Sequence, residues 1–391
     1  MKLEKKYWIA IVCKFFLIFT TFVITIFINR GLGVENKGEY AYVINLVEMF
    51  YVIFSFGLGQ AYATFKRSIG SQIQGLFVFL SLFHSVIIII IGSVIVFVKQ
   101  PEHGMIIVIL TSLAVEKVIV SMIAVIENSI KRNIIYTVMN TIYLLILAIL
   151  FFTDVISLNK VFVCYALNDF ISIVIYMFIY KMKPKCHDLS KGHLKKIYSM
   201  GFITMLVMLL ISVNYHIDTI MLKTMSTSYY VGIYSVGVNF SNMFLLIPDA
   251  FKEVLFGDST KKDFSTNIAF NSIKVSLAAS IIILIGFVFL GKFAIKLFYG
   301  IDYLPAYQLT LILFVGSLSM IFFKILQPIY ISHGKQSRAA CFLVCSAVAN
   351  IIANYFLIPR YNAVGASVAS AISYTVCGVL FLGDYIRLNN K

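Results

Sequence analysis

Charged side chains stand inside long apolar stretches of this sequence, where each needs a partner or a task. Glu116 and Lys117 are the most central, near the middle of the apolar run 104–126. On membrane-insertion scales, a charge at the centre of such a helix costs about 2.5–3.5 kcal/mol. Neighbouring residues lie about 100° apart around a helix, so both side chains could line one water-filled cavity. There the Lys117 ammonium group could bind an anionic group, or it could pair with Glu48 or Asp169, which also lie near the middle of apolar runs.

Two further lysines stand off-centre in apolar runs. By helical rise, Lys14 lies about 6 Å from the middle of run 7–29 and Lys324 about 10 Å from the middle of run 303–331. Lys324 precedes Pro328 by four residues, and that proline leaves a backbone carbonyl without its usual N–H donor. A polar lining is therefore expected at this point of the helix. Either lysine could instead extend its ammonium group to the lipid headgroups, as we expect for Lys274.

Other polar residues in the runs are His84, Asp218 and Arg30. His84 stands near the middle of run 74–98, where it could complete a hydrogen-bond network or titrate. Asp218 shares a helix face with Asn214, four residues earlier, whereas His216 is two residues away and faces elsewhere. Arg30, at the end of the first run, could guard the mouth of a cavity or anchor the helix at the interface.

Composition places the chain in a membrane. Apolar residues make up 60% of the 391 residues and charged residues 13%, against roughly 45–50% and about 25% in typical globular proteins. The mean hydropathy is +0.93. A soluble fold has too little interior for this much apolar surface, which excludes disordered chains, nucleic-acid-binding proteins and secreted disulfide scaffolds. The six cysteines are scattered without metal-ligand spacing, so we expect no metal and no cofactor.

Twelve stretches are long and apolar enough to cross a bilayer, which takes about 20 residues. They are 7–29, 39–63, 74–98, 104–126, 133–152, 160–182, 197–221, 230–251, 268–290, 303–331, 338–358 and 363–388. Only a few residues, at Pro101 and at Pro359–Arg360, separate the runs on either side of them. We therefore predict an all-α polytopic membrane protein with twelve transmembrane helices.

Basic residues are divided unequally between the two faces of such a protein. The termini and the even-numbered connections hold 20 Lys and Arg residues, and the opposite face holds 8. Cytoplasmic loops are enriched in Lys and Arg, so we predict that both termini are cytoplasmic. The longest polar connection is the basic linker 183–196, which divides the chain into two six-helix bundles, 1–182 and 197–391.

The two bundles carry traces of a duplication. Residues 38–50 read GEYAYVINLVEMF and residues 232–244 read GIYSVGVNFSNMF, with five identities at a constant offset of 194. Each segment opens the second helix of its half, so Asn45 and Asn239 would be equivalent. Copies with the same orientation are related by an axis along the membrane normal and enclose a central cleft, which is the plan of a transporter.

Four motifs in chain order resemble those of a known family. They are FGLGQAYATFKRS (56–68), DTIMLKTMSTSYYVGIYSV (218–236), LFYGIDYLPAYQLTLIL (297–313) and ANIIANYFLIPRYNAVGASVASAISY (349–374). Together with the spans and the repeat, they resemble the O-antigen (Wzx-type) flippases of the multidrug/oligosaccharidyl-lipid/polysaccharide (MOP) exporter superfamily. One departure is Asn362, which stands where glycine is usual after PRY.

This resemblance implies a MATE-like fold and a carrier for an undecaprenyl-pyrophosphate-linked oligosaccharide. Its cargo, an O-antigen or capsule repeat unit on the lipopolysaccharide route, would cross to the periplasmic leaflet of the bacterial inner membrane. A polysaccharide polymerase and a chain-length regulator would be its partners. Expected substrate contacts are Lys117, Lys14, Lys324, Glu116, Asp218 and Arg30, and Asp218 also matches an aspartate of the family's seventh helix. Expected ion-coupling residues are Glu48, Asp169 and His84.

Other functions stay open. A multidrug or cation antiporter of the same superfamily would share the fold, but its cavity would favour carboxylates over the mixed charges seen here. A membrane enzyme such as an O-antigen polymerase would place its catalytic groups in a sizeable external loop, and this sequence has none. No GxxxxGK[ST] motif occurs, so substrate supply or an ion gradient would drive transport. We therefore predict a carrier and not an enzyme.

Overall fold

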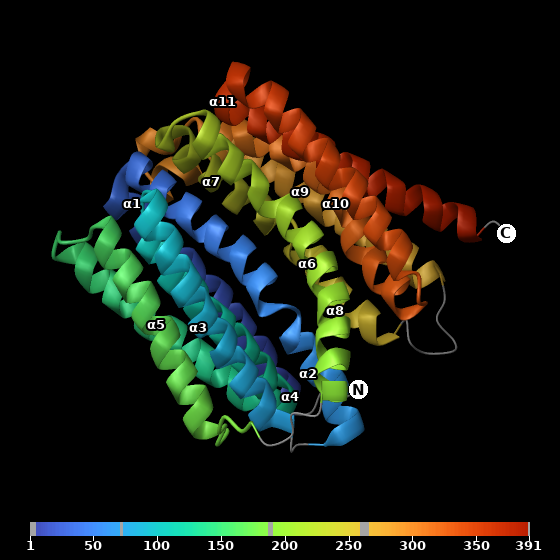
Figure 1. Cartoon of the computed structure of the whole chain (residues 1–391). Coiled ribbons are helices and arrows are strands. Elements are labelled where there is room, and N and C mark those ends of the chain that lie inside the picture. Colours follow the sequence, from blue (N-terminus) through green and yellow to red (C-terminus); the bar gives the residue numbers. More distant parts are fainter. Residues whose placement is uncertain (1–4, 71–72, 187–190, 259–265, 390–391) are drawn as a thin grey trace. The chain divides into compact units, whose positions relative to one another are not determined.

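The computed structural model describes the backbone of residues 5–70, 73–186, 191–258 and 266–389. Every regular element in these ranges is helical (Figure 1). The chain divides into two compact units, one formed by Met1–Gly33 with Val43–Leu209 and the other by Val34–Tyr42 with Leu210–Lys391. Part of the predicted linker 183–196, residues 187–190, lies outside the described residues, and the two six-helix bundles stay a prediction.

Six helices supply the first unit, wholly or in part. They are α1 (Lys5–Ser55), α2 (Leu58–Ile69), α3 (Gln74–Lys99), α4 (Gly104–Phe152), α5 (Leu158–Ile179) and the start of α6 (Lys191–Met225). Helix α4 packs against α2, α3 and α5. The core between them is apolar, with Tyr62, Phe77 and Ile119 fully buried. Large apolar side chains on the outside, such as Phe97 and Phe178, are largely exposed, as expected of a surface that faces lipid.

The second unit is built around α10 (Ala306–Ser332). This helix packs against α7 (Ser228–Met243), α8 (Leu246–Asp258), α9 (Thr266–Phe298) and α11 (Gln336–Asn389). Small residues bring α10 and α11 together, because a Cβ on Gly316 would touch the backbone of Ala371 and one on Gly378 would touch that of Ser319. Close backbone approach at small residues is a general means of packing helices in membranes.

Three helices are long enough to hold two membrane spans each. Helices α1, α4 and α11 have 51, 49 and 54 residues, and non-helical backbone interrupts them at Gly33, Asn128 and Asn362. Each interruption falls between two predicted spans. Within the described residues, eight helices are long and apolar enough to cross a membrane, and the pair α7 and α8, bent by 51°, adds a ninth crossing. With the three interrupted helices counted as two spans each, the structure is consistent with twelve crossings.

Several predicted boundaries differ from the observed ones. The last two spans meet at Asn362 (φ 48°, ψ −126°), and the helix runs through Pro359. Positive φ suits glycine best, and among other residues asparagine adopts it comparatively often. The side-chain Oδ1 of Asn362 also accepts a hydrogen bond from Ser226 Oγ at 2.6 Å, which stabilises the turn. The predicted span 39–63 is likewise interrupted at Phe56–Gly57, where both residues have positive φ.

Candidate functional site

The most central lysine of the sequence forms an ion pair between two helices. Lys117 Nζ on α4 donates to Asp169 Oδ1 on α5 at 2.5 Å. Asp169 is buried, with 2% of its side chain exposed, whereas Lys117 keeps 20% exposed. Removing one partner of a buried pair leaves an uncompensated charge, which is strongly destabilising. Of the two roles that the sequence left open, the structure thus displays the pair, and contact with a substrate stays a prediction.

Glu48 joins this pair from α1. Its carboxyl group is hydrogen-bonded to Tyr51 and interacts electrostatically with both Asp169 and Lys117. Three helices of the first unit therefore bring two carboxylates and one ammonium group together, and we name Glu48, Lys117 and Asp169 the charge triad. One carboxylate in the triad is in excess, so a proton, a cation or a further basic residue would balance it.

Arg132 supplies positive charge beside the triad. Its guanidinium carbon lies 4.8 Å from the centre of the Tyr136 ring, and Lys117 Nζ lies 5.9 Å from the same centre. Arg132 Nε also donates to Ser121 Oγ at 3.0 Å. The position of Arg132 beside the triad was not predicted, because in the sequence it stands among the charges of a connection. Its spacing to Tyr136, four residues along a helix, was the available signal.

Glu116 and Lys117 do not share one environment. Glu116 is 4% exposed and faces α3, where its carboxyl group is hydrogen-bonded to Ser81 and Ser85. Its Oε1 atom is buried without a hydrogen-bond partner in the described part of the chain. The structure therefore places Glu116 in the α3–α4 interface and Lys117 at α5. Contact of both side chains with one substrate remains a prediction that this arrangement does not favour.

The other predicted lysines and Arg30 occupy different settings. Lys324 Nζ on α10 pairs with Asp249 Oδ1 on α8 at 2.8 Å and lies 5.5 Å from the centre of the Tyr215 ring. Lys14 and Arg30 are exposed on α1. Lys274 is exposed on α9, as expected for a side chain that reaches toward headgroups.

His84 uses both ring nitrogens in hydrogen bonds. Nδ1 lies 2.7 Å from the Phe54 carbonyl oxygen, and Nε2 lies 2.8 Å from the Tyr198 hydroxyl. Phe54 lies in the last turn of α1, before the interruption at Gly57, where carbonyl groups lack helical donors. His84 thus compensates for the interruption, which is the hydrogen-bonding role that the sequence allowed, and its role in ion coupling stays a prediction.

Asp218 is enclosed by polar side chains of the second unit. Its carboxylate, 1% exposed, accepts hydrogen bonds from Asn354 Nδ2 at 2.5 Å, Ser370 Oγ at 2.7 Å and Tyr234 OH at 3.1 Å. We name these four residues the Asp218 cluster. Asn214, one turn earlier on α6, accepts hydrogen bonds from Ser346 and Ser373 in the same way.

The Asp218 cluster can hold a proton or a cation. Within the described residues, no basic side chain forms an ion pair with Asp218. A buried carboxylate without a counter-charge is costly, so it takes up a proton or binds a positive ion. Carboxylate, amide and hydroxyl oxygens are the ligands that hard cations prefer. Burial in this cluster separates Asp218 from any large substrate, so its predicted role as a substrate contact is not favoured.

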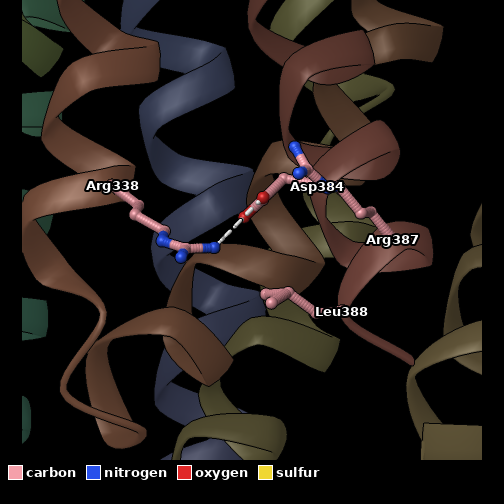
Figure 2. Close-up of a pocket in the computed structure, with 4 residues that line it drawn as sticks. All are labelled: Arg338, Asp384, Arg387 and Leu388. Atoms are coloured by element: carbon pink, nitrogen blue, oxygen red, sulfur yellow. Dashed lines mark hydrogen bonds and ion pairs between the residues drawn. The ribbon is translucent and has the colours of Figure 1, made fainter. Parts of the chain in front are cut away.

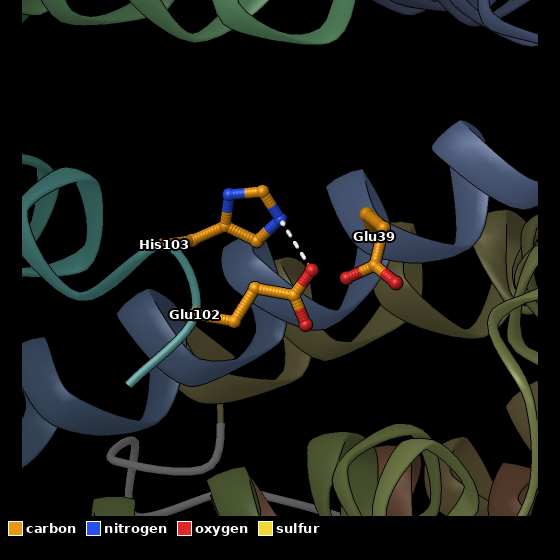
Figure 3. A group of neighbouring side chains, drawn as sticks. All are labelled: Glu39, Glu102 and His103. Carbon is orange, nitrogen blue, oxygen red and sulfur yellow. Dashed lines mark ion pairs between the residues drawn. The ribbon is translucent and has the colours of Figure 1, made fainter. Parts of the chain in front are cut away.

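A further acid and histidine lie at the turn between α3 and α4. Figure 3 shows Glu102 and His103, whose Oε1 and Nε2 atoms are 3.9 Å apart. Carboxylates and imidazoles bind metals, but two ligands are fewer than a metal centre takes. Glu39, also drawn there, belongs to the second unit, where it pairs with Lys223 and accepts a hydrogen bond from Ser228.

The segment Val34–Tyr42 approaches the start of α7 very closely within the second unit. A Cβ on Gly38 would collide with the carbonyl group of Ser228, and one on Gly232 would collide with the carbonyl group of Val34. Lys223 Nζ bonds both Glu39 and Ser228 beside this approach. We name the mutual approach of Gly38 and Gly232 the glycine contact. The sequence placed these two residues at equivalent positions of a repeat but did not predict that they meet.

Comparisons with known proteins identify the family of the chain. Residues 5–256 match the family described as "Polysaccharide biosynthesis protein". The chain belongs to this family. A comparison with curated protein sequences finds no match.

Solved structures show the same fold at low sequence identity. Lipid II flippase MurJ in an inward closed conformation gives a TM-score of 0.78 at 14% identity, over 96% of this chain and 87% of that one. An inward-facing multidrug resistance MATE family transporter of the MOP superfamily gives 0.68 at 15% identity, over 95% of this chain and 94% of that one. An outward-facing multidrug resistance MATE family transporter of the MOP superfamily gives a TM-score of 0.64 at 13% identity, over 98% of this chain and 93% of that one. These likenesses confirm the predicted fold class. The apolar helices of the described residues, taken with this fold, indicate a multi-pass membrane protein.

Proposed function

We propose that this chain is a flippase for an undecaprenyl-pyrophosphate-linked oligosaccharide. It would carry an O-antigen or capsule repeat unit from the cytoplasmic to the periplasmic leaflet of the bacterial inner membrane, with both termini in the cytoplasm. The observation that carries the proposal is the match to the polysaccharide biosynthesis family over residues 5–256. The fold shared with a structure described as a lipid II flippase supports it.

The charge triad suggests how an anionic headgroup is handled. A diphosphate in a region of low dielectric needs cationic partners, because leaving it bare is costly. Lys117 is paired with Asp169, so it becomes available to a diphosphate when Asp169 is neutralised by a proton. Arg132, whose guanidinium group also lies over the Tyr136 ring, would hold a second phosphate oxygen. Lys14 and Lys324 would receive the headgroup on the cytoplasmic half, and Arg30 would release it at the opposite mouth.

Alternating access requires one end of the carrier to open and close. The glycine contact is suited to this, because two backbones without intervening side chains close tightly and separate without repacking. The Asp218 cluster could couple the movement to an ion, since it gains or loses a positive charge in a buried place. In the cell, a polysaccharide polymerase and a chain-length regulator would use the delivered repeat unit.

A cation antiporter is the second candidate. The excess carboxylate in the charge triad favours it, because cationic cargo binds to acidic cavities. The two functions separate in proteoliposomes that contain the purified chain. We expect a fluorescent undecaprenyl-pyrophosphate oligosaccharide to become accessible to an impermeant quencher, and a cationic dye not to be exported against an ion gradient. The reverse result would support the antiporter function and contradict the flippase function.

A further inference from the structure

The two ends of α11 meet around a small pocket. Arg338 lies in the first turn of this helix, and Asp384, Arg387 and Leu388 lie in its last turns (Figure 2). The interruption at Asn362 separates the two halves of α11, so its ends can share one side of the second unit. The pocket has a volume of about 190 Å³. A water molecule takes about 30 Å³ of the liquid, so a small polar group has room here.

The charges in this pocket do not cancel. Arg338 Nη1 lies 3.2 Å from Asp384 Oδ1 (Figure 2). Tyr330 OH donates to Asp384 Oδ2 at 2.8 Å, so both carboxylate oxygens already have partners. Arg387 forms no hydrogen bond or ion pair with another side chain in the described part of the chain. Two guanidinium groups thus face one carboxylate, and the pocket carries one excess positive charge.

We propose that this arginine pocket, formed by Arg338, Asp384, Arg387 and Leu388, binds the phosphate group of an anionic bilayer lipid. A guanidinium group presents paired N–H donors that match phosphate oxygens. Helix ends of a membrane-spanning protein lie at the headgroup level, where basic residues attract anionic lipid.

A free phosphate offers the same chemistry, but the surroundings favour a lipid. Ile386 and Val379 are exposed, at 41% and 56%, next to the pocket along α11. They are seven residues apart, so they lie on one face of the helix. An acyl chain attached to a phosphate in the pocket would cover this apolar strip, which a free anion would leave bare.

The test uses the purified full-length chain in mixed micelles. Thermal unfolding is followed with dioleoyl phosphatidylglycerol, with dioleoyl phosphatidylcholine and with inorganic phosphate, and retained lipid is counted by native mass spectrometry. We expect phosphatidylglycerol to raise the unfolding midpoint by a few degrees over phosphatidylcholine, because a ligand that binds the folded state stabilises it. Arg387→Gln should weaken the apparent affinity for phosphatidylglycerol roughly five-fold, the effect of one basic residue at an anionic surface.

Two further variants separate binding from folding. Asp384→Asn removes the competing negative charge, so it should strengthen lipid binding while Arg387→Gln weakens it. A merely structural role of the cluster would not give these opposite signs. Lys274→Gln removes an exposed basic residue elsewhere in the second unit and should match the parent chain. The proposal is overturned by equal stabilisation with both lipids, by unchanged affinity in Arg387→Gln, or by inorganic phosphate that reproduces the whole shift.

Discussion

Gly38 and Gly232 meet as a reciprocal pair. Gly38 approaches the backbone of Ser228, and Gly232 approaches the backbone of Val34. The offset of 194 that relates Gly38 to Gly232 also relates Val34 to Ser228. The contact of Gly38 with Ser228 and the contact of Gly232 with Val34 are thus the same contact made twice, once from each copy of the repeat. Such reciprocity is typical of a two-fold interface. A local two-fold axis through this contact would account for the reciprocity, and the duplication of the whole half stays a prediction.

The glycine contact makes a direct prediction for the transport cycle. Gly38→Ala or Gly232→Ala places a methyl group against a backbone carbonyl, and such overpacking costs typically 1–3 kcal/mol. Forms in which the contact is closed should lose population, and transport should fall several-fold or more. In a cysteine-free background, Ser228→Cys should then react faster with an impermeant maleimide. Gly286→Ala is the matched control, because nothing lies within 4 Å of its added Cβ. Equal labelling in all backgrounds would show that the contact does not gate access.

The sequence predicted the all-helical membrane fold because apolar length alone indicates spans, and its twelve spans are consistent with the structure. It did not predict the interruption at Gly57, and it placed the break between the last two spans at Pro359–Arg360 whereas the backbone is interrupted at Asn362, since positive φ leaves hydropathy unchanged. Among the charges, pairing of Lys117 with Asp169 was foreseen as one alternative. The hydrogen-bond partners of Asp218 could not be predicted from the sequence, because Asn354 and Ser370 lie more than a hundred residues away along the chain. Periodicity shows which face of a helix is polar, but only the packed structure shows what that face meets.

Topology is predicted by the distribution of basic residues. A reporter fused after Ser190, a residue outside the described part of the chain, should be cytoplasmic, and one inserted near Tyr229 should be external. The reason is the enrichment of Lys and Arg in cytoplasmic connections. Alkaline phosphatase and green fluorescent protein fusions measure the two locations independently. An external signal at Ser190 would contradict the predicted division into two six-helix halves.

The Asp218 cluster predicts an ion-dependent step. Asp218→Asn keeps the shape of the buried side chain. Its amide oxygen can still accept from Asn354, and its NH2 group can donate to the hydroxyl oxygens of Ser370 and Tyr234, so the chain should reach the membrane at near-normal abundance. Asparagine cannot bind a proton or balance a cation, so transport should lose its dependence on the coupling gradient. Proteoliposomes with imposed proton or sodium gradients measure this. His216→Gln, two residues away on another face of α6, should retain the dependence. Retained coupling in Asp218→Asn would mark the cluster as structural.

Variants of the charge triad can distinguish a structural role of Lys117 from a role in transport. Lys117→Ala leaves Asp169 buried without its partner. Breaking a buried ion pair lowers the free energy of unfolding by about 3–5 kcal/mol, so the abundance of the chain in the membrane should drop. The double variant Lys117→Ala, Asp169→Ala removes both charges and should recover much of that stability. If Lys117 binds the diphosphate, the double variant still fails to restore surface polysaccharide in a flippase-deficient strain.

Two controls complete this test. Lys117→Arg should retain part of the activity, because charge counts for more than ammonium geometry in a wet cavity. Lys274→Ala should be nearly silent, since that side chain is exposed on α9. Polysaccharide on a gel and the abundance of the chain on a membrane immunoblot are measured in parallel. Full polysaccharide display by the double variant would mean that Lys117 serves only to neutralise Asp169, and the cationic contact for the substrate would then have to be sought at Arg132.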